Sequence, residues 1–152
     1  ISFFGMLAPI TNLFTNNIFL TILLAGGASQ LIKILIFKFR YKQRFHYKDL
    51  IVTGGMPSAH SALVGSLTTI IWLNEGFSAL FFAVFTFSLI VLRDAIGVRR
   101  SVGEEGKVIQ KIIRYEKIKI NRFHYSLGHT PKQVVIGLII GIASAIFSSA
   151  YF

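Results

Sequence analysis

The chain has 152 residues, of which 53% are hydrophobic and only 14% are charged, and it contains no cysteine. Proteins on average carry about 25% charged residues, so this composition excludes a disordered chain and argues against an ordinary soluble domain. The lack of cysteine excludes a disulfide framework, a thiolate zinc site and a cysteine nucleophile. The net charge of +10 first suggests nucleic-acid binding, but the placement of the charges argues against that class.

All sixteen Lys and Arg residues fall in two blocks, Lys33–Lys48 and Arg93–Lys132, and long apolar stretches separate and follow these blocks. A helix that spans a bilayer needs about 20 predominantly apolar residues, within a range of roughly 17–25. The sequence therefore predicts an all-α, polytopic membrane helical bundle that forms a single domain over residues 1–152. We expect four transmembrane helices at about 17–39, 57–74, 77–98 and 131–151.

The loops between these predicted helices indicate how the chain is oriented. With four spans, the loops after the first and third helices lie on one side of the membrane, and they contain both basic blocks. The positive-inside rule places these loops in the cytoplasm. We therefore expect an integral protein of a bacterial-type plasma membrane, with the basic loops on the cytoplasmic side.

A segment at about 104–120 has the periodicity of an amphipathic helix. Its apolar residues recur at spacings of three and four, at Val108, Ile109, Ile112, Ile113 and Tyr115. Its basic residues take the other face, at Lys107, Lys111, Arg114 and Lys117. This pattern is typical of an interfacial helix that anionic lipid headgroups hold at the membrane surface.

Small residues indicate where the spanning helices approach one another. Gly137 and Gly141 have the G-x-x-x-G spacing that allows two helix backbones to come close, and Gly26 with Gly27 suggests a second such position.

Polar residues that are unusual for membrane helices gather at the cytoplasmic helix ends, and ionisable residues at that depth are functional candidates by default. In chain order they are Lys33, Arg40, Ser58, His60, Asp94, Arg99, Arg100, His129 and Gln133. Cations and a helix start with free backbone N–H groups near Ser58 and Ala59 would suit a phosphate. Two histidines would supply a nucleophile and a proton donor. This set contains no carboxylate cluster for a metal pair, so we expect no metal ion. We also expect no cofactor.

Three motifs resemble, in order, the signatures of the type 2 phosphatidic acid phosphatase superfamily. Lys33 and Arg40 have the K-x6-R spacing of the first signature. The segment Pro57-Ser58-Ala59-His60 resembles P-S-G-H, and residues 129–134 resemble H-x-P-x-D-V. The segments GGMPSAHSAL, DAIGVRR and LGHTP resemble its divergent branch, which is related to acid phosphatases and vanadium-dependent haloperoxidases. The resemblance covers roughly residues 17–150. Three motifs in the same order as the signatures of the superfamily make it a specific resemblance.

The resemblance implies a role for each matching residue. His129 would be the nucleophile that takes the phosphoryl group, and His60 would protonate the leaving oxygen. The phosphate would be held by Lys33, Arg40, Ser58 and an arginine, either Arg99 or Arg100. The resemblance further implies a metal-independent enzyme that acts on lipid phosphates through a phosphohistidine intermediate.

The sequence departs from the superfamily pattern at four positions. Tyr41 replaces a Pro, Ala59 replaces a Gly, and Phe123 stands where the third signature has an Arg. Gln133 stands where the superfamily has an Asp that orients the nucleophilic histidine.

Two interpretations of Gln133 follow. It could orient His129 without a charge, or it could close a capping box with Thr130 at the start of a helix. Asp94 is expected to pair with a nearby arginine, and it could also replace the missing carboxylate.

These observations leave two function classes. The first is a membrane phosphatase that hydrolyses a phosphoric monoester or a pyrophosphate of a lipid. The alternative is a non-catalytic protein that keeps the phosphate pocket in order to bind or transport phospholipids. A nucleic-acid partner is not expected, since membrane spans interrupt the cations. Four short helices are few to enclose a lipid chain, which makes a homodimer a consistent assembly.

Overall fold

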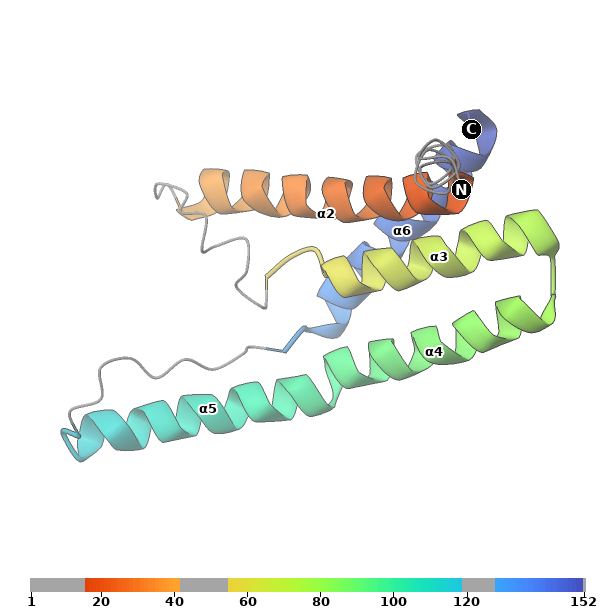
Figure 1. The fold of residues 1–152 in the computed structure, drawn as a ribbon. Coiled ribbons are helices and arrows are strands. Elements are labelled where there is room, and N and C mark those ends of the chain that lie inside the picture. The colour runs from red at the N-terminus through yellow and green to blue at the C-terminus, as the bar shows by residue number, and fades with distance from the viewer. Residues whose placement is uncertain (1–15, 42–54, 119–127, 152) are drawn as a thin grey trace, which may run out of the picture.

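The computed structural model describes residues 16–41, 55–118 and 128–151, and every regular element within these ranges is an α-helix. The helices are α2 (Asn17–Tyr41), α3 (Ala59–Glu75), α4 (Ala79–Ile96), α5 (Val98–Tyr115) and α6 (Pro131–Tyr151) (Figure 1). The predicted all-α membrane bundle is confirmed in its class, since helices that are long and apolar enough to cross a membrane make up most of the described chain.

Helix α3 lies at the centre of the bundle. It packs against α2, α4 and α6, and its contact with α6 is the most extensive. In Figure 1, α3 lies between α2 and α4 while α6 crosses behind it. The core formed by Ile70, Ile71 and Ala145 joins α3 to α6. Because α3 touches three other helices, its two ends are positioned by the whole bundle.

The predicted close approach at Gly137 and Gly141 occurs between α6 and α3. A β-carbon on Gly137 would overlap the Ser58 carbonyl, and one on Gly141 would overlap the Ala62 carbonyl. These two glycines therefore let the backbones of the two helices come together, as small residues do in membrane helix pairs.

The second predicted pair of packing glycines is only half right. A β-carbon on Gly26 would lie 3.3 Å from a methyl of Leu63 in α3, so Gly26 does sit at a helix contact. Gly27 has nothing within 4 Å of its added β-carbon. It lies on the face of α2 that the described helices leave uncovered, since neighbouring positions on a helix point 100° apart.

Three stretches of the described chain are long and apolar enough to span a membrane, namely Asn17–Ile36, Ala79–Tyr115 and Pro131–Tyr151. Helix α3, with 17 residues, is shorter than these. Helix α4 packs on the bundle mainly through α3, and Phe82, Phe87 and Ile90 on its outer side are each more than half exposed. In a membrane protein such a face contacts lipid.

Helix α5 is amphipathic and continues the direction of α4 with little change (Figure 1). The two helices meet at Gly97, whose N–H donates to the Arg93 carbonyl over 2.8 Å. A helix that lies flat on a membrane would turn away from the spanning helix before it. In this structure α5 instead extends past the bundle, and its predicted contact with a membrane surface stays a prediction.

Candidate active site

His129 lies immediately before α6, at the end of the bundle where α3 begins and α4 ends. The residue is buried, with 6% of its surface exposed. Its backbone N–H donates a hydrogen bond to the Ala95 carbonyl in the last turn of α4 over 3.2 Å. A buried imidazole at a junction of helices is held in place by its backbone and shielded from bulk water.

The glycine before His129 allows this position. A β-carbon on Gly128 would overlap the backbone nitrogen and α-carbon of Arg100 in the first turn of α5. Only glycine lets the segment lie directly on the α5 backbone. The close approach brings His129 beside Arg99 and Arg100.

Three side chains that carry or can carry positive charge act on the pKa of the His129 imidazole. Burial lowers the pKa of His129, and the charges of His60, Lys33 and Arg99 lower it further. The three residues come from three different helices, α2, α3 and α5, so the fold brings together side chains that are far apart in the chain. The combined effect keeps His129 neutral near pH 7, with a lone pair available on the ring.

Lys33 reaches the site from α2. Its side chain passes the turn before α3, where a β-carbon on Gly55 would lie 3.5 Å from the Lys33 Cε. Gly55 has a φ of +90°, a backbone conformation that glycine adopts without strain. Arg40 lies two turns further along α2, and its side chain is outside what the structure describes.

The predicted ion pair of Asp94 is present. The Nε of Arg99 donates to Asp94 Oδ2 over 2.5 Å across the joint between α4 and α5. Asp94 thus fixes the arginine whose charge acts on His129. Arg100 is paired instead with Glu104 one turn along α5, over 3.2 Å.

The start of α3 differs from the prediction in two respects. The helix begins at Ala59 with Ser58 as its N-cap, so Pro57 precedes the cap and does not occupy the first helical position. The expected free N–H of Ser58 donates to the Gln133 carbonyl over 3.1 Å. Ser58 is fully buried, and its hydroxyl accepts from both the N–H and the hydroxyl of Ser61.

Gln133 acts as a cap in this structure. Its side-chain oxygen accepts a hydrogen bond from the Thr130 N–H over 2.9 Å, and α6 begins at Pro131. This is the return half of a capping box, with Pro at the first helical position. The capping interpretation of the Gln133 side chain is thus confirmed.

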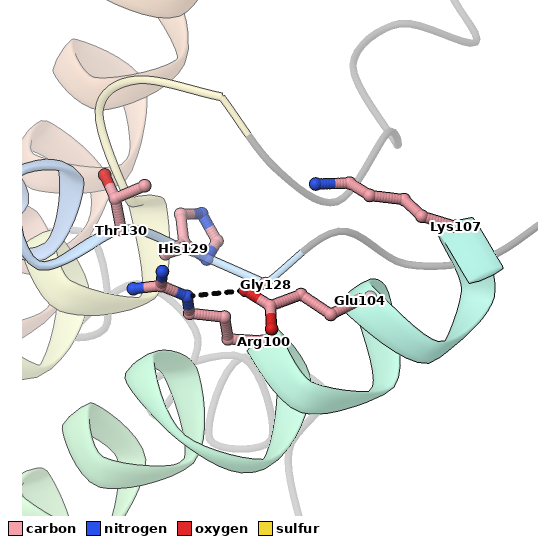
Figure 2. Close-up of a pocket in the computed structure, with 7 residues that line it drawn as sticks. Arg100, Glu104, Lys107, Gly128, His129 and Thr130 are labelled. Atoms are coloured by element: carbon pink, nitrogen blue, oxygen red, sulfur yellow. Dashed lines mark hydrogen bonds and ion pairs between the residues drawn. The ribbon is translucent and has the colours of Figure 1, made fainter.

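A pocket opens beside His129 towards α5 (Figure 2). Its volume is about 130 Å³, and it is lined by Arg100, Gly103, Glu104, Lys107, Gly128, His129 and Thr130. Among the described residues, no group of three or more His, Cys, Asp or Glu side chains is placed to hold a metal ion.

Sequence analysis did not assign Lys107 and Gly128 to the site. Lys107 was assigned only to the polar face of the amphipathic segment. Its spacing of seven from Arg100 puts both on one face of α5, which was a usable signal. The contact of Gly128 with the α5 backbone had no such signal, because it depends on how α6 approaches α5.

Comparison with known proteins matches most of the chain, including the candidate site. The sequence profile of the divergent PAP2 family matches residues 14–144 of the chain. The chain is also similar to a protein of Bacillus subtilis (strain 168) named "Uncharacterized membrane protein YuiD". The two are 35% identical over 156 residues, which cover 92% of this chain and 98% of the relative. No solved structure matches the chain. The profile match includes every candidate site residue.

Proposed function

This chain belongs to the divergent PAP2 family, and from that premise we propose that it is an integral membrane phosphatase. Its substrate is a lipid phosphate or lipid pyrophosphate, and it works without a metal ion through a phosphohistidine on His129. One observation carries this proposal: Lys33, His60 and Arg99 act electrostatically on one buried histidine from three separate helices.

The charges around His129 suit a phosphoryl group. Three groups that carry or can carry positive charge around a neutral histidine repel protonation of the ring. A phosphate between them would relieve that repulsion, since its oxygens carry negative charge. Such fixed cations also stabilise the charge that develops on the equatorial oxygens as the phosphoryl group is transferred.

The reaction has two steps. A ring nitrogen of His129 attacks phosphorus, the bond from phosphorus to the lipid oxygen breaks, and His60 donates a proton to that oxygen. In the second step water attacks the phosphohistidine and passes a proton to His60. The phosphorus–nitrogen bond breaks, which releases inorganic phosphate and restores neutral His129 and protonated His60.

The remaining predicted residues support this arrangement. Asp94 positions Arg99 through their ion pair. Ser58 is the N-cap of α3, two residues before His60, and its hydroxyl accepts the cap hydrogen bonds from Ser61. Its role in the proposal is to hold the first turn of α3 against Gln133, which fixes His60 relative to His129.

The experiment is phosphate release by the purified protein in detergent. Phosphatidate, phosphatidylglycerol phosphate and a polyprenyl pyrophosphate are supplied with a chelator, beside His129→Ala and a matched Thr86→Ala variant on the outer side of α4. We expect release that survives the chelator and Thr86→Ala and disappears in His129→Ala. Release that needs a metal, or that persists in His129→Ala, would contradict the proposal.

One observation favours the second candidate, a non-catalytic protein that binds or transports phospholipids. Gln133 stands where the superfamily has the Asp that orients the nucleophile, and the side-chain oxygen of Gln133 caps α6. If the folded wild-type protein releases no phosphate from any of the substrates but binds vesicles with phosphatidate more tightly than neutral vesicles, this second function replaces the first.

A further inference from the structure

The pocket beside His129 has features that the proposed chemistry at His129 does not use. Its wall is formed by one face of α5, where Arg100, Gly103, Glu104 and Lys107 lie within two turns. Gly128 and Thr130 form the opposite side and flank His129. A ligand with a phosphoryl group at His129 therefore has room to place a neighbouring group next to this wall.

The charges in the pocket leave one cation in excess. Arg100 and Glu104 form an ion pair over 3.2 Å, so their charges offset each other. Lys107 makes no ion pair with any described residue, and Figure 2 shows its side chain extended from α5 towards the side where His129 lies. Figure 2 also shows the far end of the Arg100 guanidinium on the side of His129 and Thr130.

The size of the pocket limits what it can hold. Its volume of about 130 Å³ is well below the roughly 300–1,000 Å³ of sites that take larger organic ligands. Gly103 and Gly128 in its wall leave space for a ligand. An acyl chain would not fit in this volume, whereas a small anionic group would meet the Lys107 ammonium and the Arg100 guanidinium, the latter already paired with Glu104.

We propose that this pocket is a subsite for a second anionic group of the substrate, with Lys107 as the residue that selects for it. The inference rests on the proposed function. The second group is a phosphate near the phosphoryl group that His129 takes. It comes either from the inner phosphate of a diphosphate ester or from a phosphodiester within the same headgroup. Lys107 thus distinguishes substrates with two anionic groups from simple monophosphates.

Matched substrates and matched lysines test the proposal. Farnesyl diphosphate is compared with farnesyl monophosphate, and phosphatidylglycerol phosphate with phosphatidate. The proteins are the wild type, Lys107→Gln and Lys111→Gln, the last a lysine one turn further on α5 that does not line the pocket. For one pair we expect Lys107→Gln to raise KM about tenfold for the substrate with two anionic groups. This is the change in affinity expected when one hydrogen bond to a charged group is lost. KM for its monophosphate partner and all values for Lys111→Gln stay unchanged.

The pair that responds identifies the source of the second anion. Equal effects of Lys107→Gln on both members of each pair, or no effect on any, would overturn the subsite.

If the wild type hydrolyses none of the substrates, the proposed function fails, and a binding measurement still decides the subsite. The probes are then inorganic pyrophosphate and inorganic phosphate. Pyrophosphate should raise the thermal midpoint of the wild type more than phosphate does, and Lys107→Gln should remove that difference. The same response to both ions in the wild type would reject the subsite.

Discussion

The backbone N–H of His129 donates to the carbonyl of Ala95 over 3.2 Å, which ties the start of α6 to the last turn of α4. A second backbone bond, from Ser58 N–H to the Gln133 carbonyl over 3.1 Å, ties the same segment to the start of α3. Both bonds use main-chain atoms only. The position of His129 therefore does not depend on its own side chain, and substitutions of the imidazole test chemistry with little change in geometry.

His60 is the proton donor in the proposed reaction, so its loss should depend on the leaving group. We expect His60→Ala to lower kcat/KM, which reports only the steps up to transfer of the phosphoryl group to His129, by about 10²- to 10⁴-fold for a lipid phosphate, whose alkoxide needs a proton. The loss should be far smaller for p-nitrophenyl phosphate, whose phenolate leaves without one. Steady-state kinetics with both substrates make the measurement.

The matched variant for this experiment is His129→Ala, which removes the nucleophile and should abolish turnover of both substrates alike. An equal loss for the two substrates in His60→Ala would show that His60 does not protonate the leaving oxygen.

The tight contact between α6 and α3 predicts a difference between two Gly→Ala changes. Gly141→Ala places a methyl against the backbone of Ala62 and Ser66 and should destabilise the fold by about 1–3 kcal/mol, as overpacking does. Gly27→Ala meets nothing within 4 Å and should leave stability unchanged or raise it by about 0.5–1 kcal/mol, because alanine favours the helix.

Thermal unfolding of the two variants in the same detergent gives the comparison. Equal midpoints for Gly27→Ala and Gly141→Ala would mean that α6 and α3 do not approach as closely as the structure has them.

The helices themselves follow from sequence because their signals are local. The apolar stretches, the uncharged windows and the Pro131 and Gln133 capping pattern are all visible within one segment. The ion pair of Asp94 was also predictable, since its partner Arg99 is five residues away.

The parts that sequence did not reveal depend on how helices meet. The Ser58 N–H is bound by Gln133 from another helix, so its availability could not be deduced from Pro57 alone. Likewise, the direction of α5 depends on the backbone at Gly97, with φ −94° and ψ −92°, which no pattern of apolar residues specifies. The amphipathic periodicity predicted the helix and left its direction open.

The orientation of the chain is tested with a single cysteine. The natural chain contains none, and Ser101 in α5 is exposed and does not line the pocket beside His129. With the basic blocks in the cytoplasm, Ser101→Cys should react with a membrane-impermeant maleimide only after cells are opened. Tyr151→Cys at the other end of α6 is the control and should react in intact cells. The reverse pattern would place the candidate site on the outer face.

The cap formed by Gln133 predicts that this residue contributes to stability more than to turnover. Gln133→Ala removes one hydrogen bond to the Thr130 N–H and should cost about 1 kcal/mol. Gln133→Glu keeps the acceptor and adds a negative charge at the N-terminus of α6, which should stabilise by about 0.3–1 kcal/mol. Thermal midpoints and kcat are measured for both. A tenfold fall in kcat for Gln133→Ala with an unchanged midpoint would instead indicate that Gln133 orients His129.

The lowered pKa of His129 predicts how stability changes with pH. Burial, with the charges of His60, Lys33 and Arg99, holds this pKa below its usual value of about 6.5. As the pH falls through about 6.5, His129 binds a proton in the unfolded chain but not in the folded chain. Proton binding therefore stabilises the unfolded state relative to the folded state. The contribution of His129 to stability is therefore fully present above this pH and is lost as the pH falls towards the folded pKa. Between pH 7.5 and pH 5.5 the thermal midpoint of the wild type should fall more than that of His129→Gln, which has no proton to bind there. Parallel curves for the two proteins would show that His129 has an unperturbed pKa, and the cations would then not converge on it.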